Sequence, residues 1–359
     1  VKTVLEEVLA EGPATASHQD LNLLAFYSWG QDSLVNLELG QQVDTFDSLY
    51  RETPEELTIE RSRFLGLYLT SLADLARHDQ AQTSSLSESQ RAELTAAVID
   101  VLTDPRLRNS NLLWVLYYAD PLSNLLQPES STAREQLLTT WSETADALEM
   151  DGSLSVGDRL NATRLKLQLA RLADAGSDLE SYAVSPELQE HARQRARWAM
   201  ETVTDESELQ SVVNTLAYVL KGAGLTDETE AMLLEKMNDT VAPYYFMSWI
   251  ASLRAEAGDA DGALAWYRKA YDASVGRYSR FRWGSTYLRR LMDLAPEGVE
   301  RIEADSVEVL SELLSHDDAF AGGNHSRLAS LESAYRQWNE EATYDAELAR
   351  IQQFVRSSC

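Results

Sequence analysis

The chain has 359 residues, of which 44% are hydrophobic, so it is long and apolar enough to bury a core. Its 58 acidic and 31 basic residues give a formal charge of −27, which disfavours nucleic acid and anionic membranes, because both attract Lys and Arg. The single cysteine, Cys359, excludes an internal disulfide. The longest apolar run, Leu112 to Ala119, is shorter than the 20 or so residues that cross a bilayer, so no membrane insertion is predicted.

Helix signals begin early in the chain and recur throughout it. The segment 53–56 (Thr-Pro-Glu-Glu) predicts a capping box with proline at the first helical position, and an apolar stripe with a 3.6-residue period follows from Leu57 to Leu75. Ser87 with Gln90 predicts a second capping box, and Ser185-Pro186 predicts another helix start. No run of alternating β-branched residues typical of strands is found. The sequence therefore predicts an all-α fold of stacked antiparallel helical hairpins.

One break in the helical pattern divides the chain into two halves. The segment 151–157 (Asp-Gly-Ser-Leu-Ser-Val-Gly) favours a boundary between an N-terminal helical region, 1–150, and a C-terminal one, 151–359. The same segment is equally suited to a long interhelix loop within one continuous array. Both interpretations stay open from the sequence.

The second half contains a signal of the tetratricopeptide type. Helices over 244–257 and 261–273, joined by a turn at Gly258-Asp259, place Ala263, Tyr267 and Ala270 where such a repeat has small, aromatic and small residues. Gly224 precedes Gly258 by 34 residues, the period of that repeat. The earlier unit, 208–221 with 227–237, matches less well because Thr229 stands where alanine is expected. The pattern predicts a tetratricopeptide-like array, with generic helical hairpins as the alternative.

Chemical motifs are scarce. The chain has no phosphate-binding glycine loop, zinc-protease motif or hydrolase nucleophile elbow. The string 315–320 (Ser-His-Asp-Asp-Ala-Phe) is similar to the aspartate-rich magnesium motif of prenyl-transferring all-α enzymes, but the further aspartate is replaced by Ala321. His316, Asp317 and His325 form a metal site only if their loop folds back, and surface histidines are the simpler interpretation. We predict no catalytic residue, metal or cofactor.

The segment 244–290 concentrates aromatic and basic side chains in an acidic protein. Aromatic residues and arginine are enriched at interaction hot spots, and guanidinium groups bind carboxylates with two parallel hydrogen bonds. The alternative is core packing, with each arginine paired to a nearby carboxylate. We predict that this aromatic–arginine segment binds a protein or peptide partner that has an acidic or extended segment. The residues predicted to bind the partner are Arg277, Arg280, Arg282, Trp283, Tyr287, Tyr244, Tyr245 and Trp249.

Part of this segment resembles a known family. The stretches 242–250 (Ala-Pro-Tyr-Tyr-Phe-Met-Ser-Trp-Ile), 258–259 (Gly-Asp), 263–271 (Ala-Leu-Ala-Trp-Tyr-Arg-Lys-Ala-Tyr) and 280–287 (Arg-Phe-Arg-Trp-Gly-Ser-Thr-Tyr) look like the helical C-terminal region of exported bacterial thioredoxin-family proteins. The resemblance implies a periplasmic or secreted setting, an active domain preceding Val1 and a role in binding a partner. The C-x-x-C motif of that family is absent from this chain, so no redox residue is carried over.

These observations favour a non-catalytic helical-repeat interaction module, associated with a thioredoxin-fold thiol–disulfide protein of the bacterial cell envelope. An all-α enzyme with an acidic central cavity and a purely structural spacer are the alternatives. Geometry separates the first two. A groove lined by aromatic residues and arginine supports binding, whereas several inward-facing carboxylates without partners support catalysis.

Overall fold

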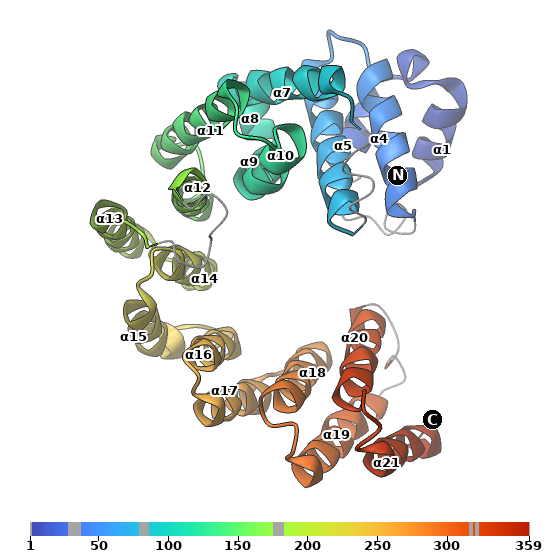
Figure 1. Ribbon diagram of the computed structural model, residues 1–359, viewed down its shortest axis with the longest axis vertical. Coiled ribbons are helices and arrows are strands. Elements are labelled where there is room, and N and C mark those ends of the chain that lie inside the picture. Colours follow the sequence, from blue (N-terminus) through green and yellow to red (C-terminus); the bar gives the residue numbers. More distant parts are fainter. Residues whose placement is uncertain are drawn as a thin grey trace. The chain divides into compact units, whose positions relative to one another are not determined.

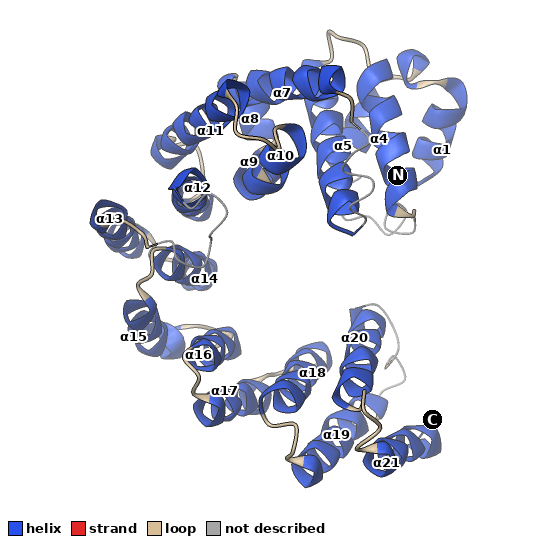
Figure 2. Cartoon of the chain, viewed as in Figure 1, coloured by secondary structure: helices blue, strands red, loops and turns tan. Residues whose placement is uncertain are grey.

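The computed structural model describes residues 2–27, 37–78, 86–174, 183–315, 319 and 323–358. These residues form helices joined by turns and contain no β-strand, so the predicted all-α fold is confirmed (Figure 2). In the same ranges no helix combines the length and the apolar composition needed to span a membrane. The chain divides into two compact units, Val1–Arg195 and Ala196–Cys359, called unit 1 and unit 2 below.

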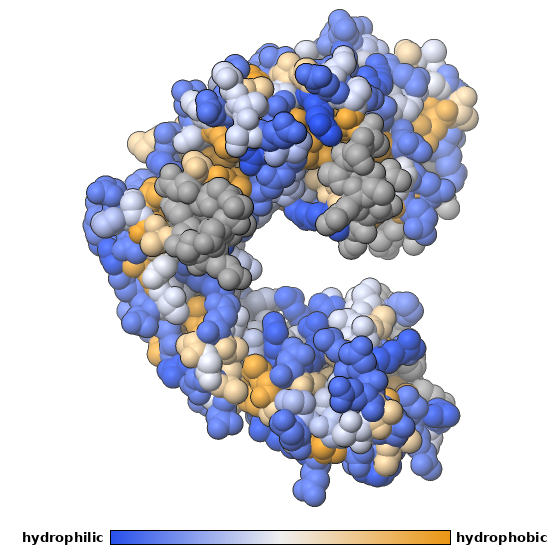
Figure 3. Space-filling view, in the orientation of Figure 1, coloured by the Kyte–Doolittle hydropathy of each residue, from blue (hydrophilic) through white to orange (hydrophobic). Residues whose placement is uncertain are grey.

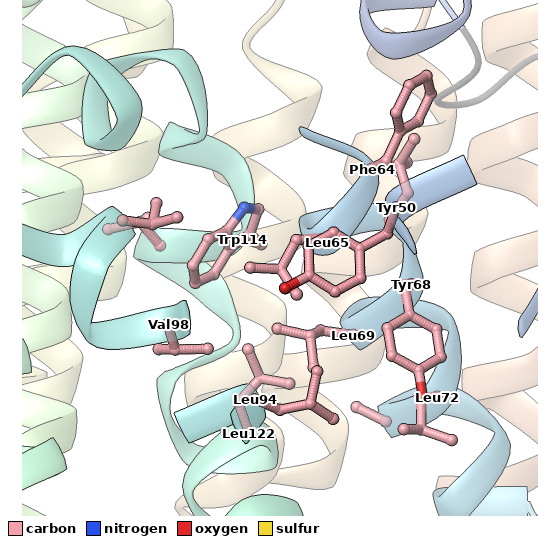
Figure 4. Close-up of a cluster of buried hydrophobic side chains, with 14 of the residues drawn as sticks. Tyr50, Phe64, Leu65, Tyr68, Leu69, Leu72, Leu94, Val98, Trp114 and Leu122 are labelled. Carbon is pink, nitrogen blue, oxygen red and sulfur yellow. The ribbon is translucent and has the colours of Figure 1, made fainter. Parts of the chain in front are cut away.

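Unit 1 is built around one long helix. The helix α5 packs against α2, α4, α8 and α10, while α11 packs against α7 and α12. These contacts bury a large apolar core, part of which is drawn in Figure 4. The helices of unit 1 are α1 (Lys2–Glu11), α2 (His18–Tyr27), α4 (Leu39–Glu52), α5 (Thr58–His78), α7 (Glu88–Thr103), α8 (Pro105–Ser110), α9 (Leu112–Tyr117), α10 (Ala119–Leu126), α11 (Thr132–Met150), α12 (Val156–Asp174) and the first part of α13 (Pro186–Thr202), with a 3-10 turn η1 (Pro13–Thr15).

A glycine and a tryptophan set the closest approach in this core. A Cβ atom on Gly66 of α5 would lie 2.3 Å from the indole Nε1 of Trp114, so only glycine allows the ring to lie here. The Nε1–H of Trp114 donates to Asn111 Oδ1 at 2.9 Å, and the Asn111 amide donates to Ser62 Oγ at 2.8 Å. The polar atoms enclosed by this packing are therefore hydrogen-bonded across α5, α8 and α9, as burial requires.

Local signals from the sequence fare differently in unit 1. The capping box at Ser87 and Gln90 is confirmed, with both reciprocal hydrogen bonds formed at the start of α7. The capping box predicted at 53–56 is wrong. Thr53 ends α4 instead, and its hydroxyl donates back to the Leu49 carbonyl at 2.6 Å, so it is not available to cap α5. The segment 151–155 joins α11 to α12, which pack against each other within unit 1.

Unit 2 is a succession of helical hairpins. Consecutive helices from α14 to α19 pack on one another, and α18 with α20 and α19 with α21 add contacts one helix further on. In Figure 1, α14, α16, α18 and α20 lie on one side of this unit and α15, α17, α19 and α21 on the other. The bounds are α14 (Glu206–Gly222), α15 (Thr226–Lys236), α16 (Tyr244–Glu256), α17 (Ala260–Ala273), α18 (Arg277–Leu294), α19 (Val299–Leu314), α20 (Gly323–Trp338) and α21 (Asp345–Ser358), with a 3-10 turn η2 (Met237–Asp239).

The residues behind the repeat prediction have the expected local roles. Gly224 and Gly258 have φ of 76° and 80°, a left-handed backbone that glycine adopts without steric cost, and each ends the first helix of a hairpin. Ala263, Tyr267 and Ala270 are buried, and their helix α17 packs closely on α16. The structure thus contains the predicted hairpins, while their membership of the tetratricopeptide class stays a prediction.

Candidate functional site

An open groove of about 750 Å³ lies on the face of unit 2 formed by α14, α16, α18 and α20. Its lining combines aromatic rings, arginines and small hydroxyl or amide side chains, with one carboxylate, Asp293. In the view of Figure 3 the surface of unit 2 is mostly hydrophilic with scattered hydrophobic patches. The lining residues are Asn214, Tyr218, Tyr245, Ser248, Trp249, Ser252, Tyr267, Arg282, Trp283, Thr286, Arg289, Arg290, Asp293, Ser330, Ser333, Ala334 and Gln337.

The structure brings half of the predicted partner-binding residues to this groove. Tyr245, Trp249, Arg282 and Trp283 line it. The other four predicted residues do not. Arg277 is the exposed first residue of α18, and Tyr244 is half-buried against Tyr245 and Trp283, whereas Arg280 and Tyr287 lie on the opposite side of α18 from the groove and contact α17 and α19.

Aromatic rings from three helices form one wall of the groove. The ring of Tyr218 on α14 meets Trp249 on α16 edge to face, with centroids 4.5 Å apart. Tyr245, also on α16, meets Trp283 on α18 in the same way at 5.1 Å. Edge-to-face pairs stabilise ring orientation, so these rings form a largely fixed surface. Trp283 is only 6% exposed, and its main contribution is to support Tyr245.

Arg280 and Tyr287 are held by unit 2 itself. The Arg280 guanidinium forms an ion pair with Glu312, lies over the Tyr271 ring and donates to the Tyr271 carbonyl at 3.2 Å. The Tyr287 hydroxyl donates to Asp305 at 2.5 Å and accepts from Arg301 at 3.1 Å. Burial and the Asp305 carboxylate raise the pKa of Tyr287 to about 12, so it stays protonated at neutral pH. For these two residues, core packing with paired charges is the interpretation that the contacts favour.

Arg282 and Arg289 differ from the other arginines of this segment. Arg282 donates to the hydroxyl of Tyr245 at 3.1 Å and lies over the rings of Tyr245 and Trp283. Arg289 donates to Ser330 Oγ at 3.2 Å. Within the described ranges neither guanidinium forms an ion pair, although the whole chain has 58 acidic residues. Two cations in an acidic protein are thus held by neutral oxygens on the groove wall.

Burial and two like charges act together on the guanidinium of Arg289. Burial lowers its pKa, and the neighbouring charges of Arg290 and Arg327 lower it further, opposed by Asp293. Asp293 itself pairs with Arg290 at 3.4 Å. The effect is to favour an anion beside Arg289, because an anion would offset the repulsion between these guanidinium groups.

Sequence reasoning missed Arg289, Ser330 and Asn214 as site residues. Arg289 belongs to the aromatic–arginine segment, and its position on the same helix face as Arg282 is the signal that could have identified it. Residues 282, 286, 289 and 293 repeat every three or four positions and so share one face of a helix. Ser330 and Asn214 had no signal, because they reach the groove through tertiary packing of α20 and α14.

The aspartate-rich string 315–320 and the possible metal ligands His316 and Asp317 lie largely or wholly outside the described residues. Among the residues that are described, no cluster of three His, Cys, Asp or Glu side chains is arranged to hold a metal ion. No protein-family model and no curated protein sequence matches the chain significantly. The groove is therefore interpreted on its own geometry.

Proposed function

We propose that this protein is a non-catalytic helical-repeat interaction module, and that the groove of unit 2 binds an extended, acidic segment of a partner protein. The observation that carries the proposal is the pair of groove arginines, Arg282 and Arg289, which have no carboxylate partner in the described part of a chain with a charge of −27. Aromatic side chains beside them supply rigid apolar contact area, as at known interaction hot spots.

The lining also separates this proposal from the enzyme alternative. A catalytic cavity built on acidic residues needs several carboxylates that face inward without partners. The groove contains one carboxylate, Asp293, and it is paired with Arg290. Open hydroxyl and amide groups, such as those of Ser248 and Asn214, are suited to hydrogen bonding with a peptide backbone. These features support binding.

The proposed setting is the bacterial cell envelope, periplasmic or secreted, where the module serves a thioredoxin-fold thiol–disulfide protein. The support is the resemblance of 242–287 to the helical region that follows the thioredoxin domain in exported proteins. In this setting the groove recruits or positions a substrate protein for a domain that carries the C-x-x-C motif. An upstream reading frame without a thioredoxin-like domain, and no such gene nearby, would count against the setting and leave the groove proposal intact.

Binding is tested with labelled nine-residue peptides in fluorescence anisotropy. A glutamate-rich peptide should bind, a lysine-rich peptide of the same length should not, and a serine-rich one should bind weakly if at all. Added salt should weaken the binding of the acidic peptide, because salt screens the attraction between solvent-exposed charges. Arg289→Gln should weaken binding about ten-fold, the effect expected for loss of one charge-assisted pair.

The matched control is Arg336→Gln on α20. Arg336 is 76% exposed, pairs only with Glu332 in the described residues and does not line the groove, but its substitution changes the net charge equally. If Arg336→Gln weakened the acidic peptide as much as Arg289→Gln, attraction would be a property of the whole surface and the groove proposal would be wrong.

A further inference from the structure

The two groove arginines occupy separate positions with opposite orientations. They are seven residues apart on α18, so they share a face and their Cα atoms lie roughly 10 Å apart at about 1.5 Å per residue. Arg282 is directed toward α16 by its hydrogen bond to Tyr245, and Arg289 toward α20 by its hydrogen bond to Ser330. One carboxylate therefore cannot bridge both guanidinium groups, and each can take its own.

Each guanidinium retains most of its hydrogen-bonding capacity. Arginine has five N–H donors, and each of these two makes a single hydrogen bond to a neutral oxygen in the described structure. A carboxylate accepts two parallel N–H hydrogen bonds from the planar guanidinium. These charge-assisted hydrogen bonds are shorter and stronger than a hydrogen bond to a hydroxyl. Tyr245 and Ser330 thus hold the two forks in place, and carboxylate ligands would complete them.

The roughly 10 Å between the two Cα atoms sets the scale for the spacing of those carboxylates, because each guanidinium extends from its own position on α18. An extended chain rises about 3.3 Å per residue, so three or four residues span roughly 10–13 Å. Two residues fall short of that distance, and six exceed it. Thr286 lies between the two arginines on α18, and the groove lining also includes the hydroxyls of Ser248 and Ser333. These neutral groups suit a peptide backbone rather than further charges.

Resting on the proposed function, we infer that the groove selects an extended internal segment with two acidic side chains three or four positions apart, one bound by Arg282 and the other by Arg289. The spacing is a specificity device, because a segment of equal charge but different spacing engages only one guanidinium. Selection by spacing is an additional property beyond attraction of negative charge.

The first test varies spacing at constant charge. Nine-residue peptides of serine and alanine, with both ends blocked, each carry one central leucine and two aspartates separated by two, three, four, five or six positions. Affinity should peak at three or four and fall about five-fold or more at two and six, the loss expected for one ion pair at a half-buried site. A peptide with a single aspartate should bind with the same affinity as the peptides whose aspartates are two or six positions apart.

The second test assigns each aspartate to an arginine by double-mutant cycles. Arg282→Gln and Arg289→Gln are each measured against peptides in which one or the other aspartate is changed to asparagine. Each arginine should couple at least about five-fold to one aspartate and less than about two-fold to the other. If a glutamine variant is less stable, Arg282→Lys and Arg289→Lys replace it in the cycle, because they keep the charge. Circular dichroism checks the fold of each variant.

The outcomes separate this inference from the proposed function. Equal affinities at all spacings, with both arginine variants still weakening every acidic peptide, would overturn the two-position inference while leaving acidic-segment binding in place. Failure of every acidic peptide to bind would overturn both. A spacing optimum that persists in the Arg282→Gln/Arg289→Gln double variant would assign the selectivity to other residues and overturn the inference.

Discussion

In unit 1 four helices pack on the single helix α5, whereas in unit 2 most contacts join helices that are consecutive or one apart in the chain. The first arrangement has one core that depends on many distant segments. The second is quasi-one-dimensional, because each helix depends mainly on its neighbours. A local change in unit 1 should therefore affect the whole core, while the same change in unit 2 should stay within a hairpin.

The units also treat charge differently. In unit 1 the buried carboxylate of Glu149 is contacted by Thr163, His191, Lys166 and Arg195. The Glu149 charge is thus compensated inside the unit. In unit 2 the groove arginines Arg282 and Arg289 are left without carboxylates in the described residues. The buried charge of Glu149 is therefore compensated within its own unit, whereas the charges of Arg282 and Arg289 are left for a partner under the proposed function.

The largest expected effect comes from adding one methyl group to the core of unit 1. Gly66→Ala places a Cβ 2.3 Å from Trp114 Nε1, and the ring is enclosed, so the packing must shift at a cost of about 3 kcal/mol or more. Hydrogen exchange should show lost protection across α2, α4, α5, α8 and α10. If protection were lost only in α5, the description of unit 1 as one interdependent core would be wrong.

The counterpart in unit 2 is Gly258→Ala. The added Cβ meets no atom within 4 Å, but the φ of 80° costs an alanine about 1–2 kcal/mol. Protection should fall only in α16 and α17, the hairpin that this turn joins. Loss of protection spreading to α20 and α21 would contradict the comparison of the two units.

A third prediction concerns the pH dependence of stability that arises from the charge cluster around Glu149 in unit 1. Burial alone raises the pKa of Glu149, but hydrogen bonds from His191 and Thr163 and the charges of His191 and Lys166 outweigh it and lower the pKa to about 2. Because folding lowers this pKa from 4.5, the stabilisation is present above pH 4.5 and is lost as pH falls toward 2. Glu149→Gln should therefore cost on the order of 3 kcal/mol at pH 7, with a deficit that shrinks below pH 4.5.

Urea unfolding followed by circular dichroism between pH 2.5 and 7 measures this difference. The control is Glu303→Gln in unit 2, whose carboxylate pairs with Arg350 at 2.7 Å, where that arginine is 51% exposed. Exposed pairs contribute little, so the control should change the unfolding free energy much less. An equal and pH-independent loss in both variants would show that burial of Glu149 has no special role.

Local signals predicted the elements of this fold more reliably than the site. Ser87 and Gln90 cap a helix because their hydrogen bonds depend only on nearby residues. Gly224 and Gly258 end helices because glycine adopts the left-handed backbone conformation at little cost, whereas other residues adopt it only with strain. Thr53 has the same capping chemistry as Ser87, but its hydroxyl bonds to the preceding helix, a choice that depends on where α4 ends.

The site depends on which face of α18 meets the groove. Positions 280 and 287 share one face of this helix and positions 282 and 289 share another, about 200° away at roughly 100° per residue. The sequence shows that the two faces exist. It cannot show that Glu312 and Asp305 of α19 cover the first face and that the second is left open, because that depends on how the hairpins pack.

The smallest effects in this comparison separate two arginines of unit 2 that have the same chemistry. Arg280→Gln removes the ion pair with Glu312, the contact with the Tyr271 ring and hydrogen bonds to backbone carbonyls. We expect it to cost about 1–2 kcal/mol of unfolding free energy. Arg289→Gln removes one hydrogen bond to Ser330 and a cation that Arg290 and Arg327 repel, so its cost should be near zero or slightly negative. Urea unfolding at pH 7 measures both changes.

Variants of the two arginines should differ in the opposite way in their stabilisation by a ligand. A saturating acidic peptide stabilises the folded state by an amount that grows with the logarithm of its affinity, so it should raise the melting temperature of Arg280→Gln as much as that of the unaltered protein. The same peptide should raise the melting temperature of Arg289→Gln less, because binding that is about ten-fold weaker removes roughly 1.4 kcal/mol of this stabilisation while the fold stays intact. Replacing a residue that stabilises the fold lowers the stability of the protein, whereas replacing a residue that binds the ligand lowers the response of the protein to ligand. If Arg289→Gln proved the less stable variant and still responded fully to the peptide, Arg289 would belong to the packing of α18 on α20, and the groove would lose its main argument.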